Sequence, residues 1–179
     1  MRALYGWLTL LLVLCLPGCA TMSADECKLA RWNEVGLRDG LAGEPLSTLN
    51  ARTQDCAEAR VTPDTRAYLQ GRDQGLQSYC RLDNAVQLGL NGKTYQGVCP
   101  APLDYEFRRR FSLGREVYDA RQQINQRELR RDELERRLKA ANKDDDRRKI
   151  RDELEDEDRK TRRARDRLRD AEWQLDRLR

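Results

Sequence analysis

The chain has 179 residues, with 35 lysines and arginines, 31 aspartates and glutamates, and no histidine. Without histidine it lacks the usual general base, the usual catalytic triad and the commonest metal ligand. The formal net charge of +4 is small beside these two large sets of charges, and this balance does not favour nucleic acid as a partner. No glycine-rich phosphate loop or serine elbow is recognisable either, so we expect no enzyme, no catalytic residue, no metal site and no cofactor.

Residues 1–18 have the pattern of a secretory signal, in which Arg2 precedes an uncharged apolar run through Leu16. A membrane-spanning helix needs about 20 apolar residues, so a retained transmembrane anchor is the weaker alternative. The run ends in Leu16-Pro17-Gly18-Cys19, which resembles the lipobox of bacterial lipoproteins. The resemblance implies that Cys19 begins the mature chain and carries lipid that holds it on a membrane. An ordinary signal peptide with an incidental cysteine is the alternative.

Ala20, and not an aspartate, follows the lipobox cysteine. In lipoproteins of Gram-negative bacteria, the absence of aspartate at this place usually accompanies transfer to the outer membrane. For a Gram-negative cell, the resemblance therefore implies a protein on the periplasmic side of the outer membrane.

Four more cysteines, Cys27, Cys56, Cys80 and Cys99, lie in the part of the chain that is exported. An even number of cysteines in an oxidising compartment predicts two disulfides. Of the three connectivities we prefer Cys27 with Cys56 and Cys80 with Cys99, because each bridge then closes a loop around one half of a small domain. A zinc site of four thiolates is the alternative, although no spacing is of the short C-x2-C type.

Residues 19–102 are predicted to form a small, lipid-anchored, Cys- and Gly-rich helical domain that needs disulfides to supplement its core. A glycine inside a helix costs about 1 kcal/mol relative to alanine, so glycines at helical spacing indicate helices whose backbones nearly touch. A ligand cleft floored by glycine is the alternative. The glycines concerned are Gly36, Gly40, Gly71, Gly75 and Gly114, and each of the first two pairs encloses an Arg-Asp dipeptide.

After Asn84 the sequence fits two structures. One is a β-hairpin that turns at Asn91-Gly92, and the other is a short helix from Asn84 that ends in Gly92 as its cap. We favour the helix, because Gly89 and Gly92 continue the spacing of small residues.

Several short motifs occur together in this part of the chain. They are the lipobox, Trp32-x3-Gly36-x2-Asp39-Gly40, Thr62-Pro63-Asp64, Tyr68-x2-Gly71-Arg72, Gly75-Leu76, Tyr79-Cys80 and Tyr95-Gln96-Gly97-Val98-Cys99-Pro100. Their combination, across most of residues 16–118, resembles the bacterial lipoprotein family catalogued as domain of unknown function 2799 (DUF2799). The resemblance implies location and shape but no activity, and no catalytic residue follows from it.

Residues 103–179 are rich in charge, with one glycine and no proline, and their apolar residues follow alternating three- and four-residue steps. The periodicity is interrupted at the sequence ANKDDDRR. This pattern predicts a long antiparallel coiled-coil hairpin that turns within residues 141–147. A single straight helix in an intermolecular coiled coil is the alternative, but it places Asp145 at a core position.

The pattern of apolar and charged residues also predicts which residues face each other across the hairpin. Large residues then face small ones at three successive layers, and a basic residue faces an acidic one. We expect Asp145 or Asp146 to cap the second helix. In order from the turn, the expected pairs that form this seam are Leu138 with Ile150, Leu134 with Leu154, Arg131 with Glu157, Arg127 with Thr161, Ile124 with Ala164, Ala120 with Leu168, Val117 with Ala171, Leu113 with Leu175, and Arg110 with Leu178.

A basic strip concentrates positive charge on the second arm of the hairpin. It is either a solvated face with ion pairs to residues such as Asp119, Glu128 and Asp166, or a contact surface for anionic envelope material such as lipid headgroups or wall polymers. The members of the strip are Arg159, Lys160, Arg162, Arg163, Arg165, Arg167 and Arg169.

Together these features predict a structural or protein-interaction lipoprotein, a scaffold of the cell envelope. Its expected partners are the membrane, through the lipid anchor, and an envelope protein whose identity the sequence leaves open, as it does the oligomeric state. The alternative is an envelope ligand-binding module that uses the glycine-lined helical domain.

Overall fold

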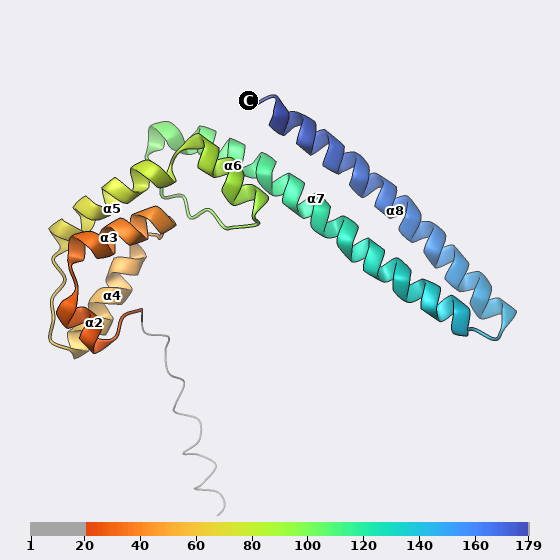
Figure 1. The fold of residues 1–179 in the computed structure, drawn as a ribbon, viewed down its shortest axis with the longest axis horizontal. Helices are drawn as coiled ribbons and strands as arrows, with labels where there is room; N and C mark the ends of the chain where they lie inside the picture. The colour runs from red at the N-terminus through yellow and green to blue at the C-terminus, as the bar shows by residue number, and fades with distance from the viewer. Residues whose placement is uncertain (1–20, 179) are drawn as a thin grey trace, which may run out of the picture. The chain divides into compact units, whose positions relative to one another are not determined.

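The computed structural model describes residues 21–178, which contain α-helices and their connections but no strand (Figure 1). The mainly helical fold expected from the sequence is therefore observed. The predicted signal peptide and Cys19 lie outside the described residues. The chain divides into two compact units, of which the first ends at Gly75 and the second begins at Leu76.

The first unit begins with a well-defined helix start. Ser23 Oγ accepts a hydrogen bond from the Glu26 N–H, and the Glu26 carboxylate accepts one from the Ser23 N–H, which is a capping box. Gly43, with φ of 72°, ends the following helix in a conformation that glycine adopts without cost. The helices are α2 (Ala24–Leu29), α3 (Trp32–Ala42), α4 (Ser47–Glu58) and α5 (Thr65–Tyr79), of which α5 continues into the second unit.

A disulfide joins α2 to α4 at the centre of the first unit. The Cα atoms of Cys27 and Cys56 are 5.4 Å apart, and both side chains are buried. The bridge closes a loop of 29 residues, a length for which a disulfide contributes about 3–4 kcal/mol to the free energy of unfolding. This contribution matters because the surrounding core is small: Met22, Trp32, Val35, Leu49 and Tyr68.

The second unit has a separate core around the second disulfide. Cys80 and Cys99, whose Cα atoms are 5.6 Å apart, pack with Tyr79, Ala85 and Phe107. Both disulfides therefore join the cysteines that the sequence predicted. The helices of this unit are α6 (Leu82–Leu90), α7 (Ala101–Ala140) and α8 (Asp144–Asp176).

A tyrosine closes the segment between α6 and α7. The Tyr95 hydroxyl donates to Asp104 Oδ1 at 2.5 Å and accepts the Cys99 N–H at 3.0 Å. Burial, followed by the hydrogen bond to Asp104, raises the pKa of Tyr95 to about 12. The Tyr95 ring lies 4.7 Å from the Phe107 ring, so the same residue links the segment to α7 by both polar and aromatic contact.

The helix preferred over the β-hairpin after Asn84 is present as α6. It begins at Leu82, two residues earlier than expected, and Gly92 follows its end with φ of 66°. The change of composition near Pro100 coincides with the start of α7, which Pro100 caps. The compact units nevertheless divide at Gly75, because α6 packs along α7.

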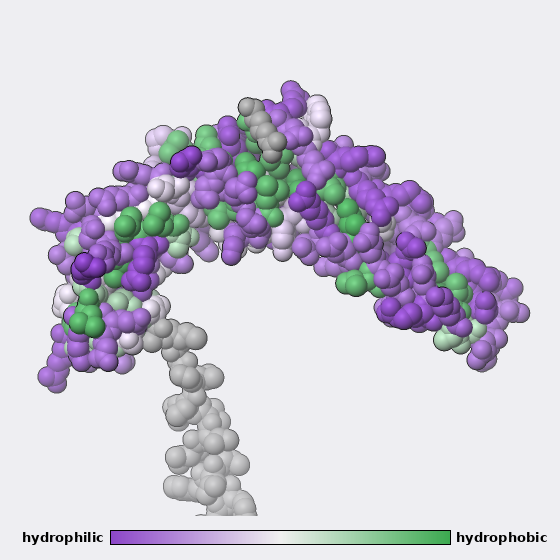
Figure 2. Space-filling view, viewed as in Figure 1, coloured by the Kyte–Doolittle hydropathy of each residue, from purple (hydrophilic) through white to green (hydrophobic). Residues whose placement is uncertain are grey.

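Helices α7 and α8 run antiparallel and side by side (Figure 1). They are joined by residues 141–143, inside the predicted turn, so the single straight helix is excluded. Every buried residue of α8 belongs to the predicted seam: Ile150, Glu157, Thr161, Ala164 and Ala171. Figure 2 shows hydrophobic side chains along this seam between two strongly hydrophilic flanks.

Two details of the predicted hairpin are wrong. Glu157 pairs with Arg127, at 3.2 Å, and Arg131 pairs instead with Glu135, at 3.0 Å. Glu135 lies one turn beyond Arg131 on the same helix, and this intrahelical partner takes the guanidinium from the seam.

The predicted cap by Asp145 or Asp146 is the second error. Helix α8 starts at Asp144 after Lys143, whose side chain makes no capping bond. Asp144, Asp145 and Asp146 therefore occupy the first turn, where their charges favour the positive end of the helix dipole.

We expect Leu134→Asp to destabilise the hairpin, because the Leu134 side chain is 0% exposed and burying an unpaired carboxylate costs several kcal/mol. Leu129→Asp is the matched control on the same helix, since Leu129 is 70% exposed. Thermal unfolding followed by circular dichroism should show a lower midpoint for the first variant only. Equal midpoints for the two variants would contradict the seam.

Candidate functional site

Helices α3 and α5 touch through their backbones. A Cβ atom at Gly36 would lie 1.9 Å from the carbonyl oxygen of Tyr68, a distance that atoms cannot adopt. Gly40, Gly71 and Gly75 would each place a Cβ within 2.4 Å of a backbone oxygen of the opposite helix. The space beside these glycines is therefore filled by the neighbouring backbone, which leaves no room there for the floor of a ligand cleft.

In the second unit, α6 and α7 also touch through their backbones at glycines. A Cβ at Gly114 would lie 2.5 Å from the Val86 carbonyl oxygen, and a Cβ at Gly89 would lie 2.3 Å from that of Phe111. All five glycines singled out in the sequence thus lie at helix contacts, and Gly89 is the partner of Gly114.

We expect Gly36→Ala and Gly71→Ala to lower the free energy of unfolding by about 1–3 kcal/mol or more, because the added methyl group forces the helices apart. At an exposed helical position the same change stabilises by about 1 kcal/mol, so the sign is diagnostic. Gln74→Ala, on the exposed side of α5, is the control. Urea denaturation with the disulfides intact measures the difference, and a stabilised Gly36→Ala protein would contradict the contact.

Of the two Arg-Asp dipeptides between the glycines, one buries its aspartate and the other buries its arginine. In α3 the aspartate, Asp39, is 4% exposed, whereas in α5 the arginine, Arg72, is 8% exposed. Their neighbours Arg38 and Asp73 are exposed. The cause is a shift of one residue, because the dipeptide of α5 directly follows Gly71 and that of α3 does not directly follow its glycine. One residue turns a helix by about 100°.

Asp39 is the centre of a polar cluster that joins α3, α4 and α5. Arg52 donates to it through two bonds, Nε to Oδ2 at 2.9 Å and Nη2 to Oδ1 at 2.6 Å. The Tyr68 hydroxyl donates to Oδ2 at 2.7 Å. Three donors therefore surround one carboxylate, in the bidentate arrangement that makes an arginine–carboxylate pair strong.

The cluster holds its protons firmly. Burial, and then the hydrogen bond to Asp39, raises the pKa of Tyr68. Burial by itself lowers the pKa of Arg52, but the hydrogen bonds and charge of Asp39 outweigh it and the net shift is upward. Neither donor gives up a proton near neutral pH, so the geometry suits a structural tie between helices better than acid–base chemistry.

Arg72 lies beside this cluster and is only partly satisfied. Its Nη2 donates to the Glu44 carbonyl oxygen at 2.9 Å, and its buried Nε has no hydrogen-bond partner among residues 21–178. The first contact ties α5 to the segment that follows α3.

We expect Asp39→Ala to lower the free energy of unfolding by about 3–5 kcal/mol, because it leaves the Arg52 charge without its buried partner. Asp73→Ala removes the exposed aspartate of the other dipeptide and should change stability by less than about 0.5 kcal/mol. Chemical denaturation of the two variants makes the comparison. Similar losses in both would show that the buried carboxylate is not what matters.

The basic strip of α8 is largely paired. Arg165 reaches across the hairpin to Glu128 at 3.2 Å, and Arg169 pairs with Asp166 at 2.5 Å, as the sequence suggested. Asp119, the third expected partner, pairs instead with Arg115 of its own helix, at 3.0 Å. The remaining contacts are those of Arg167 with Gln123, Arg159 with Glu155 and Asp156, and Lys160 with Asp156 and Glu157.

Arg162 and Arg163 differ from the rest of the strip. Both are exposed, and neither has a hydrogen bond or ion pair with another residue of the described part of the chain. They are consequently the two positions at which the strip offers charge to a partner without first breaking an existing contact.

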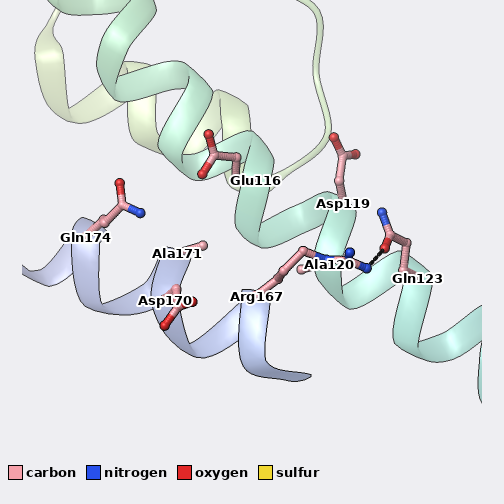
Figure 3. Close-up of a pocket in the computed structure, with 8 residues that line it drawn as sticks. All are labelled: Glu116, Asp119, Ala120, Gln123, Arg167, Asp170, Ala171 and Gln174. Carbon is pink, nitrogen blue, oxygen red and sulfur yellow. Dashed lines mark hydrogen bonds between the residues drawn. The ribbon is translucent and has the colours of Figure 1, made fainter. Parts of the chain in front are cut away.

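A groove of about 340 Å³ lies on the hairpin between α7 and α8 (Figure 3). It exists because two small residues, Ala120 and Ala171, face the gap, and Figure 3 shows Arg167 crossing it to Gln123. Polar side chains from both helices border it: Glu116, Asp119, Gln123, Arg167, Asp170 and Gln174.

Within residues 21–178, no group of three or more cysteine, aspartate or glutamate side chains is arranged to hold a metal ion. The four described cysteines are disulfide-bonded. None of the helices in the same range has the length and apolar character needed to cross a membrane.

Comparison with known families gives one match. Residues 31–116 match the profile of a family described as "Protein of unknown function (DUF2799)". Residues 31–116 are a DUF2799 domain. Searches of curated proteins and of solved structures found no match.

The DUF2799 domain extends from just before α3 into α7. It contains every glycine contact described above, the Asp39 cluster and the second disulfide. Cys27 of the first disulfide lies before it, and the whole of α8 lies after it. The hairpin beyond residue 116 therefore lies outside the matched domain.

The Asp39 cluster was not predicted from the sequence, although a signal was present. Trp32, Gly36 and Gly40 mark the buried face of α3, and Asp39 lies three residues after Gly36, on that same face. A carboxylate among small and aromatic residues at helical spacing indicates a buried charge that needs a partner.

Proposed function

We propose that this protein is a lipoprotein of the cell envelope that holds a partner protein with its helical hairpin. The lipobox around Cys19 supports the lipid anchor, and Ala20 after it supports the periplasmic side of the outer membrane. The two disulfides indicate an oxidising, extracytoplasmic compartment.

The observation that carries the proposal is the extent of the hairpin beyond the DUF2799 domain. The core of the second unit uses α7 near Phe107 and Phe111, whereas α7 continues to Ala140 and α8 returns over 33 residues. The added helices bury only a narrow seam, and Figure 2 shows mainly hydrophilic residues over the face of the hairpin in view. So much exposed surface is not needed to stabilise the domain, and it suits contact with a partner.

The contact is expected to involve the middle of α8, around Arg162 and Arg163. Arginine is enriched at protein interfaces because its guanidinium binds carboxylates through two bonds. An unpaired arginine also loses no intramolecular ion pair when a partner arrives. Binding through such exposed charges weakens with salt, since they are screened within about 8 Å at physiological ionic strength.

Deletion of residues 119–169, rejoined through a short turn, should leave a lipidated DUF2799 domain with both disulfides that no longer retains its partner. Crosslinking in living cells, followed by identification of the crosslinked proteins, measures retention, and disulfide mapping checks the fold. Full complementation of a deletion strain by this variant would show that the hairpin is dispensable.

Charge reversal gives a finer comparison in the intact chain. Arg162→Glu with Arg163→Glu should abolish the crosslink, whereas Arg136→Glu with Arg151→Glu should preserve it. Arg136 and Arg151 are the matched control because they are exposed and unpaired within the described hairpin. Equal losses from the two double variants would indicate a response to net charge and not a contact at the strip.

A further inference from the structure

The first described residues are bound tightly to α4 by a single carboxylate. The Thr21 N–H and the Thr21 hydroxyl each donate to Asp55 Oδ2 at 2.6 Å, and the Met22 N–H donates to the same atom at 3.2 Å. Arg52, one turn earlier on α4, donates from Nη1 to the Thr21 carbonyl oxygen at 3.3 Å. We call this arrangement of Asp55 and Arg52 around Thr21 the clasp.

The residues that follow Thr21 are also held in place by contacts with the first unit. The Met22 side chain is 7% exposed and belongs to the core of the first unit. Ser23 then opens the capping box of α2, and the disulfide from Cys27 returns to α4 at Cys56. From Thr21 onward the chain is therefore fixed relative to α4.

The clasp lies two residues after the proposed lipidation site. Each residue spans at most about 3.6 Å, so Cys19 and Thr21 are separated by no more than about 7 Å. A lipid chain on Cys19 enters the bilayer, which requires that cysteine to lie at the membrane surface. The fixed part of the domain then begins within about 7 Å of that surface.

Resting on the proposed lipidation of Cys19, we propose that the clasp holds the first unit directly against the lipid headgroups, with α2 and the C-terminal half of α4 at the membrane. The protein is thus docked on the bilayer through a protein surface and is not suspended from it by a tether. This orientation is a property of the folded domain, because the carboxylate that binds the anchor segment belongs to α4 itself.

The side chains at the end of α2 suit such a contact. Leu29 is 82% exposed, although it lies only two residues after the buried Cys27. The Lys28 and Arg31 side chains on either side of it are 58% and 78% exposed, and they form surface ion pairs with Asp25 at 3.6 Å and with Glu34 at 2.9 Å. An exposed apolar side chain bordered by charged groups fits the boundary between acyl chains and polar headgroups, and exposed ion pairs of this kind contribute little stability that a headgroup would have to replace.

The clasp itself is tested by amide hydrogen exchange on the lipidated protein in vesicles of phosphatidylethanolamine and phosphatidylglycerol. The Thr21 and Met22 amides should be protected in the native protein and exchange at least tenfold faster in Asp55→Ala. Glu58→Ala, which removes an exposed carboxylate of the same helix that has no partner in the described chain, should leave both amides protected. Unprotected amides in the native protein would overturn the proposal.

Contact with the membrane is tested by energy transfer from Trp32 to dansyl groups on the lipid headgroups of these vesicles. Trp173→Phe leaves Trp32 as the sole tryptophan after the predicted signal peptide. A flexible insert of 20 glycines and serines between Ala20 and Thr21 spans about 25 Å on average and should lower the transfer. Leu29→Ser should lower it less than the insert does. Equal transfer with and without the insert would overturn the proposal.

Mass spectrometry of the N-terminal peptide separates this inference from the proposed function. Absence of acyl chains on Cys19 removes the anchor, and with it both the function and the docking. An acylated Cys19 with unprotected Thr21, or with transfer that ignores the insert, leaves the lipoprotein in place and removes only the docking.

Discussion

The fold depends on helix backbones that touch. Between α3 and α5 four glycines allow carbonyl oxygens of one helix to occupy the positions where the other would carry side chains. This closeness brings Tyr68 of α5 within hydrogen-bond distance of Asp39 of α3, and Arg52 of α4 completes the group. The polar cluster thus exists because the helices are too close for an apolar layer between them. The disulfide then supplements a core that is correspondingly thin.

In the second unit, backbone contact through glycine holds the base of the long hairpin. Gly89 and Gly114 bring α6 against α7, and the aromatic rings around Phe107 cover the second disulfide. Helix α7 is therefore held firmly along its first turns, where it belongs to the DUF2799 domain. A helix fixed at its base can extend far beyond it, and α8 supplies the second arm. The two arms thereby expose a large surface while they bury only a single narrow seam.

Much of this architecture follows from the sequence, because the signals are local. Cysteine order predicted both disulfides, and spacing predicted the glycine contacts, the turn and the buried face of α8. The features that the sequence did not predict are of two kinds. One depends on a shift of a single residue along a helix, which changes the face that a side chain occupies. The other depends on which of several carboxylates an arginine pairs with. The two Arg-Asp dipeptides have the same sequence, but their positions relative to the preceding glycine differ by one residue. Asp39 is therefore buried in one dipeptide and Arg72 in the other. Arg131 pairs with Glu135 one turn away on its own helix, and Glu157 pairs with Arg127 instead.

The seam of the hairpin is not uniform along its length. Leu134 and Ile150 are buried near the turn, and Val117, Ala120 and Ala171 are buried near the base, but Glu157 and Thr161 occupy the middle. The buried Glu157 carboxylate pairs with Arg127 and Lys160, and a buried charge is stable only while such partners remain in place. The two apolar stretches of the seam are therefore separated by a polar layer. We expect local opening of the hairpin to begin in the distal stretch, away from the contact between α6 and α7.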